Sequence, residues 1–243
     1  MQEKMSSEGQ ARVSVDIVRW TYPNDRLHSD HWLEPLSVDE KERAFSYRFE
    51  RDRTCFIAGR YLLRRTLAVY LSEPAEGLRF VSNAYGKACI EGDEGVEFSL
   101  TNADGLVAVA VGRGCGHVGI DCEPADLILE DAALETFCTF DELSWIAQLS
   151  SDERRRAGLT LWTLKESYLK AIGLGLNEDP QNIAISWDGD IPRIAHKGER
   201  DPRWHHRLFN GSGRHIIALS VYAELGTPTF RLSDFQDGAA ISE

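Results

Sequence analysis

The sequence has few cysteines, and their arrangement excludes two classes of small protein. There are five among 243 residues, an odd number, and no two of them form a Cys-x-x-Cys pair. A disulfide framework needs paired cysteines, and a zinc knuckle needs closely spaced ones. A zinc site at Cys115, His117 and Cys122 would lack an evident fourth ligand. We therefore expect reduced thiols at Cys55, Cys89, Cys115, Cys122 and Cys138.

Long apolar runs and an excess of positive charge are also missing. No stretch of about 18 uncharged apolar residues occurs, which is the length that a membrane-spanning helix needs. Residues 1–13 are polar and charged, unlike a secretory signal, so we expect a soluble cytoplasmic protein. The net charge of −12 opposes non-specific attraction to nucleic acid or to anionic lipid. We therefore predict no nucleic-acid partner and no membrane association.

Several catalytic signatures are absent as well. The chain has no Gly-x-Ser-x-Gly, no Gly-x-x-x-x-Gly-Lys-Ser/Thr and no His-Glu-x-x-His. The sequence therefore does not predict a serine hydrolase with a nucleophile elbow, a P-loop nucleotide-binding protein or a zinc protease. Two histidine pairs, His28 with His31 and His205 with His206, have little motif specificity, and we expect these residues on the surface or in loops.

What is present is enough apolar sequence for a substantial core. Hydrophobic residues make up 42% of the chain, sufficient for one large domain or two small ones. Ser37-Val-Asp-Glu40 and Thr139-Phe-Asp-Glu142 predict helix starts, and Asp52 is expected to cap a helix over 53–71. Residues 228–243 carry little signal and are expected to fray. Strands and hairpins are predicted within 13–20, 80–90, 98–111, 118–123, 183–187, 207–209 and 215–222, with a turn at 210–213.

A helix predicted over 159–172 has charged residues beside its packing face. At 100° per residue its apolar positions share one stripe, while Trp162, Glu166 and Lys170 lie within an arc of roughly 80° beside it. The Gly-Leu-Gly that follows ends the helix, because glycine adopts the left-handed conformation of a C-terminal cap at little cost. Alone, Glu166 and Lys170 are also consistent with an ordinary ion pair on a solvent-facing surface.

A pair of carboxylates lies on a predicted strand. In residues 118–123 the apolar positions alternate toward the core, so Asp121 and Glu123 project from the opposite face, about 7 Å apart. Carboxylate oxygens are the ligands that Mg²⁺ requires, and this ion often completes its shell with water and substrate phosphates. An acidic strand face without a ligand is the competing interpretation, and the pair alone does not decide between the two.

Arginines supply a basic counterpart in the first half of the chain. On the helix predicted over 53–71, Arg53, Arg60 and Arg64 lie within roughly 40° of one another, and Arg51 lies just ahead of it. Arginine forks match phosphate oxygens bidentately, which favours an anion site. A solvated basic face is the alternative, since charge runs usually lie on the surface.

Together these motifs resemble one known family. Residues 119–123 (Gly-Ile-Asp-Cys-Glu) and 162–176 (Trp-Thr-Leu-Lys-Glu-Ser-Tyr-Leu-Lys-Ala-Ile-Gly-Leu-Gly-Leu) are similar to the two signature motifs of the 4′-phosphopantetheinyl transferases of the Sfp type. The family's N-terminal coenzyme A-binding segments also have counterparts, in the same order, at 51–53, 59–64, 85–87 and 98–102. On these motifs the sequence is identified as a member of that family.

The resemblance implies a fold and an activity. The fold is α/β (α+β), with two similar subdomains, 1–115 and 116–243, related by pseudo-two-fold symmetry and with coenzyme A in the cleft between them. The activity is a magnesium-dependent transfer of the 4′-phosphopantetheine arm to a serine of an apo acyl or peptidyl carrier protein, with release of adenosine 3′,5′-bisphosphate. A monomer is expected, because each chain already contains both halves.

The resemblance also assigns roles to individual residues. Asp121, Glu123 and Glu166 would hold the metal, and Asp121, Glu166 and Lys170 would carry catalysis. In that scheme Glu166 takes the proton of the carrier serine, and Lys170 acts on the departing phosphate. Contacts with the coenzyme are expected from Arg51, Arg60, Tyr85, Gly86, Lys87, Thr101, Asn102, Asp121, Lys165 and Lys170.

The chain departs from the family pattern at two positions. Many family members have histidine where Asn102 stands and proline where Ala88 stands. Asparagine donates hydrogen bonds but cannot become cationic, which predicts a weaker or less pH-dependent hold on the coenzyme. Two alternatives stay open: a coenzyme-binding protein without transfer activity, and a Mg²⁺-dependent phosphohydrolase acting on coenzyme A or a nucleotide. No motif names the carrier or its pathway.

Overall fold

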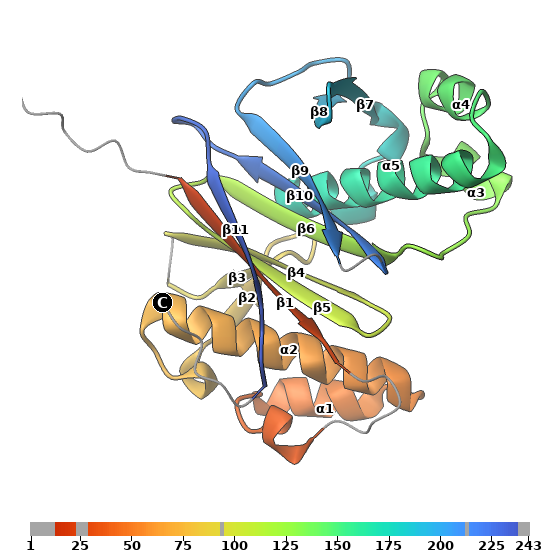
Figure 1. Ribbon diagram of the computed structural model, residues 1–243. Helices are drawn as coiled ribbons and strands as arrows, with labels where there is room; N and C mark the ends of the chain where they lie inside the picture. Colours follow the sequence, from red (N-terminus) through yellow and green to blue (C-terminus); the bar gives the residue numbers. More distant parts are fainter. Residues whose placement is uncertain (1–12, 23–28, 93–94, 212–213, 238–243) are drawn as a thin grey trace, which may run out of the picture.

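The computed structural model describes residues 13–22, 29–92, 95–211 and 214–237 and has a mixed α+β architecture (Figure 1). The predicted α+β class is therefore confirmed. The strands are β1 (Ser14–Thr21), β2 (Phe80–Ser82), β3 (Ala88–Ile90), β4 (Val96–Ala103), β5 (Leu106–Arg113), β6 (His117–Pro124), β7 (Ile183–Asp188), β8 (Ile191–His196), β9 (Trp204–Gly211), β10 (His215–Tyr222) and β11 (Thr229–Asp234). The α-helices are α1 (Val38–Ser46), α2 (Glu50–Leu71), α3 (Asp131–Phe137), α4 (Phe140–Ile146) and α5 (Ser151–Ile172). Short 3-10 helices are η1 (Asp30–Leu33), η2 (Ala75–Gly77), η3 (Gly175–Asn177) and η4 (Pro180–Asn182).

The N-terminal half is a four-stranded sheet covered by one long helix. The strand order is β11-β1-β5-β4, and α2 packs on its outer face with α1 beside it (Figure 1). Ile57 and Leu62 of α2 share one buried cluster with Val107, Val109 and Val111 of β5. Each fully enclosed aliphatic side chain contributes about 1.5–3 kcal/mol, so this cluster holds α2 against the sheet.

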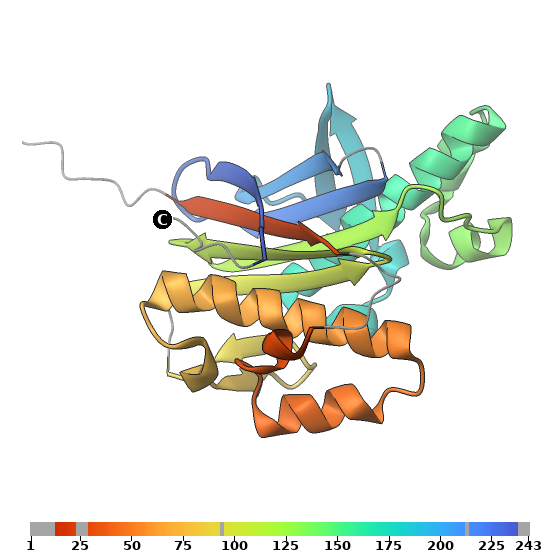
Figure 2. The same cartoon turned by 60° about the horizontal axis from the view of Figure 1, so that its bottom comes forward.

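The C-terminal half has the same arrangement on the other side. Its sheet has the order β6-β10-β9, and α5 packs on the outer face (Figures 1 and 2). The inner faces of the two sheets meet in a second core, which joins Val15, Ile17 and Ala110 to Ile120 and Leu219. The molecule is therefore layered as helix, sheet, sheet and helix.

Helix α5 lies very close to β6, because the strand has a glycine where the two cross. A Cβ built on Gly119 would lie 2.0 Å from the carbonyl oxygen of Ser167 and 2.4 Å from the amide nitrogen of Ala171. Those separations are far below van der Waals contact, so only glycine fits at this position. The close approach brings Asp121 of the strand within reach of Lys170 of the helix.

The C-terminal residues contradict the expectation that 228–243 would fray. Strand β11 pairs in parallel with β1, and Phe235 is buried in the N-terminal core. Most side chains of β11 are exposed and show no alternation, so its sequence lacked a strand signal, and backbone pairing with an open edge formed it instead. Residues 116–243 therefore do not all lie in one half of the fold. Residues 238–243 lie outside the described part of the chain.

Two of the predicted helix caps are confirmed, and a third is wrong. Ser37 and Thr139 each form the predicted capping box with a glutamate three residues on. Helix α2 begins at Glu50, with Phe49 in the capping position, so Asp52 lies inside the first turn and does not cap the helix. An acidic residue in the first turn still interacts favourably with the helix dipole.

The other predicted elements occur with shifted ends. Helix α5 begins earlier than the predicted residue 159, because Ser150 and Glu153 form a further capping box. Strands β9 and β10 pair as predicted, whereas residues 212–213 of their turn lie outside the described residues. In the parts of the chain that the structure describes, no helix has both the length and the apolar character needed to cross a bilayer.

Candidate active site

The predicted acidic and basic residues meet where β6 and α5 cross. Lys170 Nζ lies 2.7 Å from Asp121 Oδ1 and also donates a hydrogen bond to Thr101 Oγ1 at 3.2 Å. Beside them, the indole Nε1 of Trp162 donates to Glu123 Oε1 at 3.1 Å. The strand's two-residue period and the helix's i,i+4 spacing aim these side chains at one another. The structure therefore brings together residues from both sequence motifs.

Thr101 links this group to the N-terminal sheet. Its buried hydroxyl donates to Asp121 Oδ1 at 3.2 Å and accepts a hydrogen bond from the backbone N–H of Cys122 at 3.1 Å. One pleat along β4, Ser99 Oγ accepts from the N–H of Ile120 at 3.1 Å. Side chains of β4 thus satisfy the backbone of β6, and the orientation of Asp121 depends on both halves of the fold.

The surroundings change the acid–base properties of these groups. Burial raises the pKa of Glu166, and the nearby charge of Asp121 raises it further. The same two causes raise the pKa of Glu123. Burial of Lys170 favours its neutral form, but the charge and hydrogen bond of Asp121 outweigh it, so the pKa of Lys170 is raised. Lys170 is therefore positively charged at neutral pH.

Two buried carboxylate oxygens lie among these residues. Asp121 Oδ2 and Glu166 Oε1 accept no hydrogen bond from any residue that the structure describes. Leaving such oxygens unsatisfied is costly, and a hard divalent cation is a ligand that they bind well. Asp121, Glu123 and Glu166 therefore fit the predicted metal in chemistry, although the described residues contain no ready-made group of three His, Cys, Asp or Glu side chains that could hold an ion.

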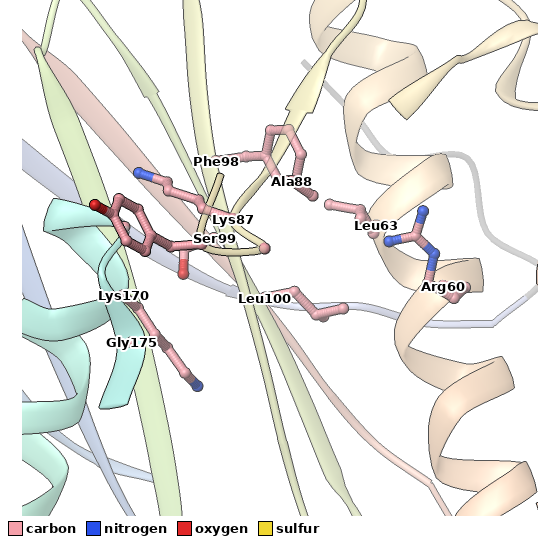
Figure 3. A pocket seen from close by; sticks show the side chains of 12 residues that line it. Arg60, Leu63, Lys87, Ala88, Phe98, Ser99, Leu100, Lys170 and Gly175 are labelled. Atoms are coloured by element: carbon pink, nitrogen blue, oxygen red, sulfur yellow. The ribbon is translucent and has the colours of Figure 1, made fainter. Parts of the chain in front are cut away.

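Lys170, the partner of Asp121, also lines a cavity of about 290 Å³ (Figure 3). Its walls come from α2, the turn between β2 and β3, β4, and the end of α5. One part of the lining is apolar, with Leu63 and Leu100, while Arg60 and Lys170 bring positive charge. Lys87 also lines the cavity, but its ammonium pairs with Glu97 at 3.1 Å. Because Lys170 lines the cavity and also pairs with Asp121, the cavity and the carboxylates of Asp121, Glu123 and Glu166 form one continuous site.

The residues expected to contact the coenzyme are only partly gathered at this cavity. Arg51 does not line it, since its exposed side chain pairs with Asp104 at 3.1 Å. Asn102 is an exposed residue of β4 beside Gly59 and is also absent from the lining. The expected contacts that do line the cavity are Arg60, Tyr85, Gly86, Lys87 and Lys170.

The arginines of α2 do not converge on one anion site, contrary to one of the two interpretations of their spacing. Arg64 is buried and donates to Glu40 Oε2 at 2.7 Å and to the carbonyl oxygens of Ala75 and Leu78. Arg60 pairs with the other oxygen of Glu40. The sequence marked Glu40 only as a capping residue, and no local pattern showed that it would serve as the internal counter-ion of two arginines.

Lys165, predicted as a coenzyme contact, does not line the cavity. Its side chain is fully buried, and Nζ donates to Glu142 Oε2 at 2.7 Å and to the carbonyl oxygens of Phe137 and Pro180. These three acceptors use all the donors of an ammonium group. Lys165 lies near the apolar stripe of α5 and therefore points into the C-terminal half, away from the cavity.

The histidines of the two sequence pairs differ in their burial. His206 lies on β9 and is only 3% exposed, which contradicts the expectation of a surface or loop residue. Its Nδ1 is 2.9 Å from Ser220 Oγ, which in turn is 2.8 Å from Ser167 Oγ on α5. His31 is exposed, as expected, and His28 lies outside the described residues.

Comparison with known proteins identifies the family of this chain. The 4′-phosphopantetheinyl transferase superfamily matches residues 117–220, the segment that contains β6 and α5. A 4′-phosphopantetheinyl transferase from Aneurinibacillus migulanus is 33% identical over 164 residues, covering 67% of this chain and 67% of the relative. A phosphopantetheinyl transferase from a Thraustochytrium species is 30% identical over 206 residues, covering 76% of this chain and 70% of the relative.

Among solved structures, the holo-[acyl-carrier-protein] synthase of Thermotoga maritima is 22% identical and covers 46% of this chain and 65% of its own, with a TM-score of 0.39. That likeness is too weak to support an argument. The sequence relatives are sufficient: this chain belongs to the 4′-phosphopantetheinyl transferase superfamily and is an enzyme of that class.

Proposed function

We propose that the protein transfers the 4′-phosphopantetheine arm of coenzyme A to a serine of an apo acyl or peptidyl carrier protein and releases adenosine 3′,5′-bisphosphate. The observation that carries this proposal is the Lys170–Asp121 ion pair. Lys170 lines the cavity, and Asp121 lies beside the carboxylates of Glu123 and Glu166. A phosphorylated substrate would place its apolar and charged parts against matching walls of that cavity.

The coenzyme would lie in the cavity with its diphosphate toward Lys170. The backbone around Tyr85 and Gly86 would meet the adenine, and Arg60 would supply positive charge at the opposite wall. Arg60 shares Glu40 with Arg64, so only part of its charge is neutralised by its own partner. Arg51 and Asn102 lie beyond the cavity and would reach the coenzyme only through a part that extends past its rim.

Asp121, Glu123 and Glu166 would hold Mg²⁺. When bound, this ion would neutralise charge on the diphosphate and polarise it toward attack. Support for the site comes from Asp121 Oδ2 and Glu166 Oε1, two buried oxygens that find no hydrogen-bond partner among the residues that the structure describes. Lys170 would then remain with Asp121 Oδ1, leaving the opposite carboxylate oxygen available.

The chain's own residues would perform the proton transfers. Glu166 would accept the proton of the carrier serine, directly or through water, as the serine oxygen forms its bond to the β-phosphorus of the coenzyme. The bond between that phosphorus and the bridging oxygen breaks, and Lys170 would stabilise or protonate the departing phosphate. Asp121 and Thr101 would hold Lys170 in place for this step.

The proposed division of labour follows the two halves. Residues 1–115 would contribute the contacts with the 3′-phosphate and the adenine of the coenzyme, and residues 116–243, apart from β11, would contribute the metal and catalytic groups. A carrier protein that is itself acidic would have to dock on a local basic or apolar patch, because the net charge of −12 repels it. We predict that the enzyme is a cytoplasmic monomer.

Mass spectrometry tests the proposed function directly. The full chain is incubated with coenzyme A, Mg²⁺ and a panel of apo carrier proteins, and the mass of each carrier is measured. A phosphopantetheinyl mass gain on one carrier supports transfer. If every carrier stays apo while coenzyme A is hydrolysed, the protein is a phosphohydrolase and the proposal is wrong.

A further inference from the structure

The turn between β2 and β3 lies against the C-terminal end of α5, although the two belong to different halves of the fold. Asn83 Oδ1 builds the turn by accepting the backbone N–H groups of Tyr85 and Lys87, each at 2.9 Å. With its other side-chain atom, Asn83 Nδ2 donates to the carbonyl oxygen of Gly173 at 3.2 Å. One side chain therefore shapes the rim of the cavity and contacts the end of the catalytic helix.

Lys87 makes a second link of the same kind. Its ammonium donates to the carbonyl oxygen of Ala171 at 2.9 Å and to that of Val118 at 3.4 Å, and it pairs with Glu97 at 3.1 Å. These acceptors lie on α5, β6 and β4, and together they take all three ammonium donors. The predicted contact between this ammonium and a coenzyme phosphate is therefore at odds with its position.

Helix physics explains why α5 benefits from these donors. The last carbonyl oxygens of a helix have no partner within it, and they form the negative end of the helix dipole. Gly173 adopts a left-handed φ of 71°, and a Cβ at this residue would lie 2.8 Å from Asn83 Nδ2. The end of α5 is thus capped from outside, by a cation and an amide that the N-terminal half supplies.

We propose that Asn83 and Lys87 are positioning residues, which clamp the end of α5 and thereby hold Lys170 at the junction of cavity and acidic group. Lys170 immediately precedes Ala171, whose carbonyl oxygen Lys87 holds, and both clamp residues belong to the turn that carries Tyr85. A ligand seated on that turn is coupled through the clamp to the position of Lys170. This inference rests on the proposed function for the role of Lys170, but the clamp itself is a property of the protein alone.

Hydrogen exchange of the free protein tests the clamp without any turnover. Asn83→Asp keeps the oxygen that builds the turn but cannot donate to Gly173, and Lys87→Met keeps the length of the side chain without its charge. Each variant should exchange amides in residues 171–176 about 5-fold faster or more, as expected for the loss of one or two hydrogen bonds of about 1 kcal/mol each. Val81→Thr, an exposed change in the same hairpin, should leave exchange unchanged.

Steady-state kinetics then tests positioning against direct binding. In both variants kcat should fall about 5- to 10-fold, while KM for coenzyme A changes less than roughly 2-fold. Unaltered exchange at 171–176 in both variants would overturn the clamp. So would a loss confined to KM with kcat unchanged, because that result would make Lys87 a coenzyme ligand. If the wild-type enzyme modifies no carrier at all, the proposed function fails, and the exchange comparison still decides the clamp.

Discussion

Lys170 Nζ lies 2.7 Å from Asp121 Oδ1 and joins the last turns of α5 to the middle of β6. Asp121 is almost fully buried, whereas the side chain of Lys170 is 31% exposed. The pair therefore has a buried anionic end and a cationic end that faces the cavity. A cation held in this way is available to a phosphate without leaving its carboxylate partner.

The first prediction concerns the charge of Lys170. Lys170→Met should lower kcat about 100-fold, because the departing phosphate loses its stabilising cation. Lys170→Arg, which keeps the charge, should retain more of the rate than the methionine variant. Lys197→Met is the matched control, since Lys197 is an exposed lysine remote in sequence from the site and should stay within roughly 2-fold of wild type. Rates are measured as carrier modified per minute; equal loss in Lys170→Met and Lys197→Met would contradict the role.

Substitution of Glu166 should lower the transfer rate without lowering the stability of the fold. Glu166→Gln keeps the size of the side chain but removes its ability to accept a proton, so transfer should fall by at least about 100-fold. The same change removes the charge of a carboxylate whose buried Oε1 has no hydrogen-bond partner in the described part of the chain, so the melting temperature should stay equal or rise. Transfer assays and calorimetry on one preparation measure both effects. Retention of the wild-type rate would remove Glu166 from the mechanism.

Lys165 should matter for folding and not for the coenzyme. Lys165→Met leaves Glu142 as an uncompensated buried charge, and the free energy of unfolding should drop by about 3–5 kcal/mol. Adding Glu142→Gln to that variant should recover part of the loss, since the double change removes both charges. Urea unfolding gives these free energies. An intact stability with a raised KM for coenzyme A would show instead that Lys165 binds the substrate.

The buried His206 should make the free energy of unfolding depend on pH. Burial lowers the pKa of His206 to about 3, so the folded protein keeps it neutral while the unfolded chain takes up a proton near its ordinary pKa of about 6.5. Because the unfolded state binds more protons between these values, stability is present above pH 6.5 and is lost as the pH falls toward 3, by up to about 1.4 kcal/mol per pH unit.

The check for His206 is a comparison of two pH profiles. His206→Gln cannot take up that proton, so its free energy of unfolding should fall less steeply between pH 6.5 and 4.5 than that of the wild type. Denaturant unfolding at several pH values supplies both curves. Parallel curves for the two proteins would mean that another group causes the acid sensitivity.

Local patterns predicted much of the fold but missed particular elements. The capping boxes at Ser37 and Thr139 predicted two helix starts correctly, because a capping box involves residues only three positions apart. Strand β11 gave no comparable signal, since most of its side chains are exposed and its partner, β1, lies at the far end of the chain. The pairing of Glu40 with Arg60 and Arg64 was equally invisible, because it joins separate helices.

The sequence by itself determined which residues share a face: Asp121 with Glu123 on β6, and Glu166 with Lys170 on α5, through periods of two and 3.6 residues. Only the tertiary structure decided that these faces meet, because the crossing at Gly119 depends on the packing of separate elements. It also decided which cations are available. The ammonium groups of Lys165 and Lys87 donate their hydrogen bonds to acceptors inside the protein, whereas Lys170 reaches the cavity. The spacing of residues in the sequence does not distinguish a charge that pairs with a buried partner from one that binds a substrate.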